Sequence, residues 1–129
     1  TEVKRVQRRR FARVETLLEV WYAPVPQGDE APAFRQGWAV NLSGGGLCLA
    51  TDCRFEIGEQ ILLRFTLDLG ERRLEVATPG RIVRRDVMSE GSPGSGYRYG
   101  VEFLDLPMRE QDLICRYVFR KMAERRRLR

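Results

Sequence analysis

The chain has 129 residues, of which 43% are hydrophobic and 32% charged, a composition typical of one globular domain with a single core. It contains no histidine, and its three cysteines lack a C-x-x-C spacing, which argues against a zinc site and against hydrolysis by a histidine-activated nucleophile. No apolar run approaches the roughly 18 residues that a membrane-spanning helix needs. We therefore expect a non-enzymatic domain without metal or cofactor, in a reducing cytoplasm.

The net charge of +5 is concentrated at the two ends of the chain. Residues 1–13 carry six basic residues against one acidic residue, and residues 120–129 have the same balance, whereas the residues between them are net acidic. A protein that follows a nucleic-acid backbone spreads its positive charge along a groove or face, so this distribution argues against a nucleic-acid polymer as partner. The N-terminus has no initiating methionine and no signal-peptide pattern, and we expect a domain of a longer protein.

The periodicity of apolar residues divides the chain into an arm and a series of strands. Residues 1–13 have no such periodicity, and we expect them to form a flexible basic arm. Alternation then predicts six strands, at residues 14–22, 34–40, 47–50, 60–69, 72–85 and 97–103. The fifth strand is expected to bend or bulge at Pro79-Gly80, and residues 89–96 are expected to form a mobile hairpin loop, because they are rich in glycine and serine.

After Pro107 the apolar period changes to that of an amphipathic helix. The residues on its apolar stripe are Leu113, Ile114, Tyr117, Val118 and Met122. We predict a mainly β fold, with a small six-stranded antiparallel barrel over residues 14–106 and a helix with a basic tail over residues 107–129. Trp21 and Trp38 fit the core or the wall of this barrel better than an exposed base-stacking site.

Two short motifs carry the chemistry. Arg9 and Arg13 lie four residues apart, on one side of an extended segment, and guanidinium groups bind phosphate or the O6/N7 edge of guanine through paired hydrogen bonds. In the predicted turn, Asn41 and Ser43 offer oxygens that accept from guanine N1–H and N2–H, and Gly46 lets a ring or phosphate approach the backbone. Each motif alone has an ordinary alternative, a solvated basic tail or a turn that satisfies only its own backbone. Together they indicate one site for an anionic ligand.

The two motifs, in this order, resemble those of the PilZ domain, a bacterial receptor module for cyclic di-GMP. The resemblance runs from Gln7 to Met122, and includes Gly80-Arg81-Ile82-Val83 and Tyr99-Gly100-Val101-Glu102-Phe103. The segment around the arginines is most similar to the C-terminal PilZ domain of flagellar-brake proteins. The resemblance implies a cytoplasmic six-stranded barrel that binds cyclic di-GMP and passes the signal to a neighbouring domain or a protein partner.

The resemblance also implies roles for individual residues. Arg9 and Arg13 would contact guanine and phosphate, and Arg8 stands where the family often has a further basic residue, which fits a stacked ligand dimer. Asn41, which stands where many members have Asp, and Ser43 would contact polar atoms of guanine. The ligand-binding residues expected on this basis are Arg8, Arg9, Arg13, Asn41, Ser43, Gly45 and Gly46.

The hypothesis that follows is a switch in which ligand phosphates neutralise the arm and order it on the barrel. A first alternative is a PilZ-like adaptor that binds protein partners and no nucleotide. A nucleic-acid binder built on a small barrel is a second alternative, and the acidic body argues against it. An enzyme is the hypothesis with the least support, for want of a histidine, a metal cluster or a nucleophile motif.

Overall fold

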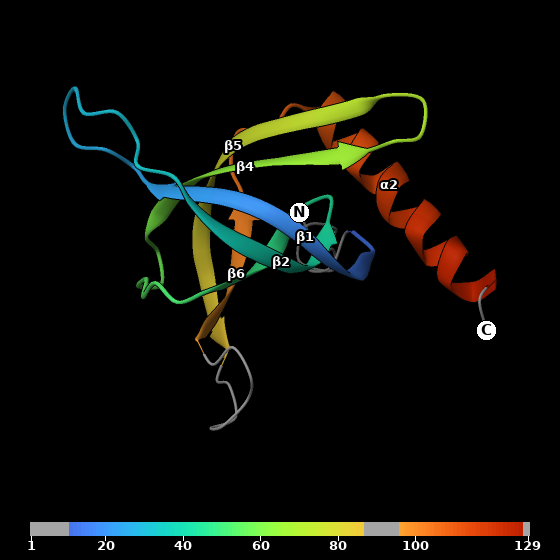
Figure 1. Ribbon diagram of the computed structural model, residues 1–129, viewed down its shortest axis with the longest axis horizontal. Coiled ribbons are helices and arrows are strands. Elements are labelled where there is room, and N and C mark those ends of the chain that lie inside the picture. Colours follow the sequence, from blue (N-terminus) through green and yellow to red (C-terminus); the bar gives the residue numbers. More distant parts are fainter. Residues whose placement is uncertain (1–10, 87–95, 128–129) are drawn as a thin grey trace, which may run out of the picture.

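The computed structural model describes residues 11–86 and 96–127, and Figure 1 shows a barrel with one helix against its side. The elements are β1 (Arg13–Pro24), β2 (Arg35–Ser43), β3 (Gly46–Thr51), β4 (Gln60–Asp68), β5 (Arg73–Asp86), β6 (Tyr97–Phe103) and α2 (Met108–Arg127). The strands pair antiparallel and close in the order β1-β2-β3-β6-β5-β4. The predicted fold class is therefore confirmed. Most of the predicted arm and most of the predicted hairpin loop lie outside the described residues.

The alternate residues of the strands fill the barrel interior. In β4, Ile61, Leu63, Phe65 and Leu67 are each no more than 4% exposed, as the alternation predicted. Three residues of the helical stripe join the same apolar cluster from α2: Ile114, Tyr117 and Val118. Because each such side chain contributes about 1.5–3 kcal/mol on burial, the shared core holds the helix on the barrel.

Trp21 and Trp38 lie on the outer surface of the barrel wall. Their exposed fractions are 43% and 40%, so neither belongs to the core. Trp21 pairs with Gln36 and Trp38 pairs with Glu19, which makes the two indoles diagonal neighbours across β1 and β2. Of the two positions that we expected for them, the core or the wall of the barrel, the structure shows the wall.

The second strand is longer than predicted. β2 continues to Ser43, so Asn41 and Ser43 lie in the strand and the turn itself consists of the glycines that follow. The reason is pairing with β1, in which Glu15 faces Asn41 and Arg13 faces Ser43. The polar residues that resembled a turn are thus held in extended backbone by a strand distant in sequence.

At Pro79-Gly80, where we expected a bend or a bulge, the pairing with β4 has no bulge. Pairing of β5 with β4 continues through both residues without a shift, and the irregularity lies further on, between Ile82 and Arg84, in the pairing with β6. The carbonyl oxygen of Pro79 accepts from the Leu104 N–H at 2.8 Å, just beyond the end of β6. Since N–H and C=O of one residue point the same way in a strand, the missing proline N–H faces that end, and the ladder with β4 loses nothing.

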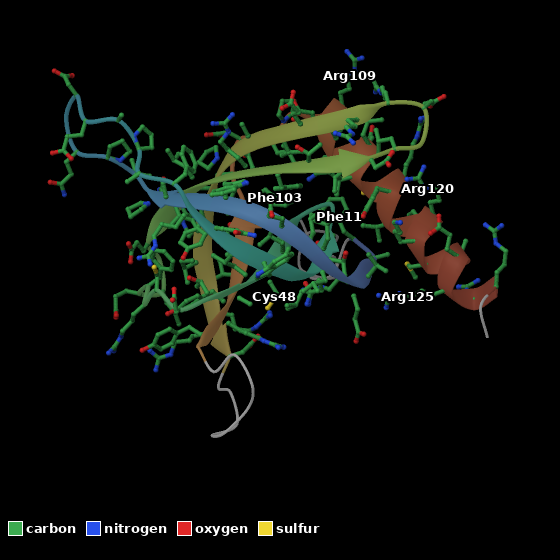
Figure 2. The ribbon with its side chains drawn as sticks, in the orientation of Figure 1. Phe11, Cys48, Phe103, Arg109, Arg120 and Arg125 are labelled. Carbon is green, nitrogen blue, oxygen red and sulfur yellow. The ribbon has the colours of Figure 1, made fainter. Side chains whose placement is uncertain are left out.

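Side chains of α2 fasten the helix to the barrel. The Arg120 guanidinium donates to the carbonyl oxygen of Leu69 at 2.6 Å, in the turn that joins β4 to β5, and to that of Asp68, the last residue of β4 (Figure 2). Arg125 donates to the Glu15 carbonyl oxygen of β1, and its guanidinium lies 3.7 Å from the Glu15 carboxylate. The orientation of α2 is therefore fixed by polar contacts as well as by its apolar stripe.

We predict that Arg120→Ala lowers the free energy of unfolding by about 1.5–3 kcal/mol, because it removes two hydrogen bonds from a charged donor. Urea unfolding followed by circular dichroism measures the change. Arg116→Ala is the control, since Arg116 lies one turn earlier on α2, is exposed and makes no hydrogen bond or ion pair within the described residues. Equal destabilisation by the two variants would contradict a specific role of Arg120.

Candidate functional site

A cavity of about 490 Å³ lies where the end of the arm, the turn between β2 and β3, and strands β5 and β6 meet. Its lining residues include Phe11, Arg13, Asn41, Ser43, Gly45, Gly46, Arg84, Glu102 and Gln111. The two motifs of the sequence thus contribute to one cavity. Arg13 and Ser43 are direct cross-strand partners, which explains how an arginine at residue 13 and a polar motif at residues 41–46 come together.

Five of the seven predicted ligand-binding residues line this cavity: Arg13, Asn41, Ser43, Gly45 and Gly46. The other two, Arg8 and Arg9, lie outside the described residues. Arg13 is exposed and has no ion-pair partner within the described part of the chain. The side chain of Asn41 makes no hydrogen bond within that part either. Both groups are therefore available to a ligand.

Each carbonyl group of the turn has its own hydrogen-bond donor. The Gly44 oxygen accepts from Gln111 Nε2 at 3.2 Å, and the Gly45 oxygen accepts from the Phe103 N–H at 2.9 Å. Ser43 Oγ donates to the Gly46 oxygen at 3.3 Å and accepts from the Gly45 N–H at 3.2 Å. The Ser43 hydroxyl thus serves the turn itself, and a ligand can reach only its remaining acceptor capacity.

The glycines of this turn serve close packing rather than unusual backbone angles. None of residues 44–46 has a positive φ. A Cβ on Gly44 would lie 2.5 Å from Cys115 Sγ and 3.0 Å from the Phe11 ring, and a Cβ on Gly46 would overlap the Val101 carbonyl oxygen. The helix, the arm and β6 therefore approach this turn more closely than any side chain allows.

Two charged residues that line the cavity were not identified from the sequence. The Arg84 guanidinium lies against Gly100 of β6 and donates from Nε to Asp86 Oδ1 at 2.8 Å, which fixes its position. Glu102 lies 4.0 Å from the Arg81 guanidinium. The pairing of β5 with β6 shifts between Ile82 and Arg84. Because of this shift, the alternation of side chains along β5 does not predict on which side Arg84 lies.

Two of the cysteines lie close to the site and are poor nucleophiles. Burial, and then the Asp112 carboxylate, raises the pKa of the Cys115 thiol. Burial, and then Asp86, raises the pKa of the Cys48 thiol. A raised pKa disfavours the thiolate, so neither group resembles a catalytic cysteine. Within residues 11–86 and 96–127, no cluster of three acidic or sulfur ligands could hold a metal ion.

A closed six-stranded barrel with a cavity between an arginine-bearing arm and a glycine turn defines a class of small ligand-binding domain. The model of the PilZ domain matches residues 7–120, and the chain belongs to this family. No helix in the described ranges combines the length and apolar character that crossing a membrane requires.

Individual relatives are more distant. The uncharacterised protein YpfA of Bacillus subtilis is 23% identical over 128 residues, which are 98% of this chain and 55% of YpfA. The structure of the Bacillus subtilis inhibitor of motility MotI/DgrA superposes with a TM-score of 0.73 at 23% identity, over 93% of this chain and 54% of that one. Escherichia coli YcgR in complex with c-di-GMP superposes with a TM-score of 0.64 at 15% identity, over 93% and 48%. These structures share the fold, and the chain spans about half the length of each relative.

We predict that Gly46→Ala costs more stability than Gly45→Ala. A Cβ at residue 46 meets backbone of β6, which cannot move alone, whereas a Cβ at residue 45 meets only the Phe11 ring, at 3.0 Å. Overpacking against fixed atoms costs about 1–3 kcal/mol. Urea unfolding of the two variants gives the comparison, with Gly45→Ala as the matched control. A larger loss for Gly45→Ala would show that Phe11 packs more rigidly than β6 at this turn.

Proposed function

We propose that this chain is a receptor domain that binds cyclic di-GMP in the cavity between the arginine arm and the β2–β3 turn, and that it performs no catalysis. The observation that carries the proposal is that Arg13, Asn41, Ser43, Gly45 and Gly46 line one cavity. The c-di-GMP complex of the relative YcgR supports the choice of ligand. Arg8 and Arg9 precede Phe11, a lining residue of the cavity, by only three and two residues in the sequence.

The charges of the cavity suit a ligand with two phosphates. Arg13 has no anionic partner within the described residues, and Arg84 keeps donors beyond the Nε that binds Asp86. Glu102 is the acidic residue of the lining, and Arg81 lies beside it. Planar guanidinium groups at this position can bind phosphate bidentately or contact guanine O6 and N7, while the Asn41 carbonyl can accept from guanine N1–H.

A second part of the proposal concerns the signal. We propose that ligand phosphates bring the part of the arm that precedes Phe11, residues 1–10, against the barrel, and that the altered surface near Arg13 transmits the signal to an attached domain or a protein partner. The energy for this change comes from tighter ligand binding to the ordered state. Similarity to an inhibitor of motility makes motility control the first output to test.

The receptor function predicts saturable binding of cyclic di-GMP in isothermal titration calorimetry, weakened in Arg9→Ala and Arg13→Ala. Loss of a hydrogen bond from a charged donor costs about 1.5–3 kcal/mol, so we expect roughly 10- to 150-fold weaker binding in each variant. Arg54→Ala is the control, because Arg54 lies outside the lining of the cavity. A folded wild-type protein that gives no heat would reject the receptor function and favour the nucleotide-free adaptor. The stoichiometry distinguishes one ligand from a stacked pair.

The switch predicts that saturating cyclic di-GMP slows amide hydrogen exchange in residues 1–10 relative to the ligand-free domain. Exchange mass spectrometry of the same sample compares this segment with β4, which lies outside the cavity and serves as the internal control. Binding without any change of exchange in the arm would leave the receptor function intact and reject the switch.

A further inference from the structure

Gln111 is the residue of α2 that lines the ligand cavity; the other described lining residues come from the chain before β1, from the strands and from the β2–β3 turn. It lies in the first turn of the helix, where its backbone N–H donates to the Pro107 carbonyl oxygen at 3.0 Å. The backbone at this position is thus fixed, and the side chain extends toward the turn between β2 and β3. Gln111 belongs to neither of the two sequence motifs.

The hydrogen bond to the turn determines which way the Gln111 amide points. Nε2 lies 3.2 Å from the carbonyl oxygen of Gly44. A carbonyl oxygen only accepts, so the amide must present its nitrogen to Gly44 and turn its oxygen away. Oε1 has no hydrogen-bond donor within the described residues. Gln111 therefore keeps two groups for a ligand, the second hydrogen of Nε2 and the Oε1 acceptor, and of its two amide heteroatoms Oε1 is the one without a partner within the described residues.

The chemistry of the ligand limits what such an acceptor can bind. Phosphate oxygens accept hydrogen bonds and cannot donate to Oε1, whereas guanine and ribose carry donors. The Asn41 carbonyl is the acceptor assigned above to guanine N1–H. The guanine 2-amino group has two hydrogens and can serve a second acceptor, and the ribose 2′-hydroxyl can also donate.

On the basis of the proposed receptor function, we infer that Gln111 is a specificity-determining residue whose Oε1 accepts a hydrogen bond from the nucleoside part of cyclic di-GMP, from either the guanine 2-amino group or the ribose 2′-hydroxyl. In this arrangement arginines bind the phosphates, and Gln111 discriminates between ligands by the donor groups of their nucleosides. The same amide would join the bound ligand to Gly44 of the turn and to the start of α2. Ligand binding would thus contact the helix directly, through one side chain.

The test uses Gln111→Met, which has a similar length and helix propensity and lacks both polar atoms. Gln111→Leu is a second variant, in case methionine fills the cavity. Asp112→Asn is the matched control, because Asp112 is the next residue, is exposed and does not line the cavity. Calorimetry measures the affinity of each protein for cyclic di-GMP, for the inosine analogue that lacks the 2-amino group, and for the 2′-deoxy analogue.

We expect both Gln111 variants to bind cyclic di-GMP roughly 2- to 10-fold more weakly than the wild type, with Asp112→Asn unchanged. One analogue should bind to the wild type more weakly than cyclic di-GMP does. The same analogue should bind to the Gln111 variants as tightly as cyclic di-GMP does, and the group that it lacks is then the donor. Weakening without loss of either discrimination would overturn the inference, because Gln111 would then act through Nε2, by holding Gly44 or by donating to the ligand. Unchanged affinity of the variants would also overturn it while the receptor function stands. A wild type that does not bind cyclic di-GMP would reject both.

Discussion

The approach of β6 to the β2–β3 turn is the constraint on which the site depends. Gly46 lies so close to the Val101 carbonyl that a side chain would overlap it, and the same proximity lets the Gly45 oxygen reach the Phe103 N–H. With its carbonyl groups bound by three separate elements, the turn has little freedom left. Folding therefore fixes this wall of the cavity before a ligand arrives, and binding need not supply the free energy of ordering it.

Two arginines in different states line the same cavity, Arg13 from β1 and Arg84 from β5. Arg84 is held by Asp86 and lies against Gly100, whereas Arg13 extends from the first position of β1 without an ion-pair partner among the described residues. A guanidinium that is already paired loses little side-chain entropy on binding, and an unpaired one contributes more charge. The cavity thus has one guanidinium held by an ion pair, that of Arg84, and one without an ion-pair partner among the described residues, that of Arg13.

The barrel could be predicted from the sequence because its determinants are local. Alternation in β4 and the helical stripe of α2 depend on neighbouring residues, and both were correct. The errors have a common cause, since they concern contacts between distant segments. Asn41 resembles a turn residue until β1 pairs with it, and Pro79 resembles a strand breaker until its carbonyl is seen to face Leu104.

The same distinction separates the parts of the site. Arg13 and Asn41 could be identified because their residue types at a given spacing carry a recognisable chemistry. Gln111 could not be identified, because a glutamine in the first turn of a helix is ordinary until the helix is placed against the Gly44 carbonyl. Gly45 and Gly46 line the cavity, and what requires glycine at this turn is the closeness of neighbouring atoms and not a positive φ.

The polar attachment of α2 has a consequence for how the sequence can change. Gln111, Arg120 and Arg125 each donate to main-chain carbonyl oxygens of the barrel, in the β2–β3 turn, the β4–β5 turn and β1. A main-chain carbonyl persists whatever side chain its residue carries, so substitutions at most of these acceptor positions leave the donors satisfied. The donors of α2 are side chains, so a substitution of a donor residue removes its hydrogen bond. Random mutagenesis should therefore find more tolerated substitutions at the acceptor residues of the barrel than at the three donor residues of α2.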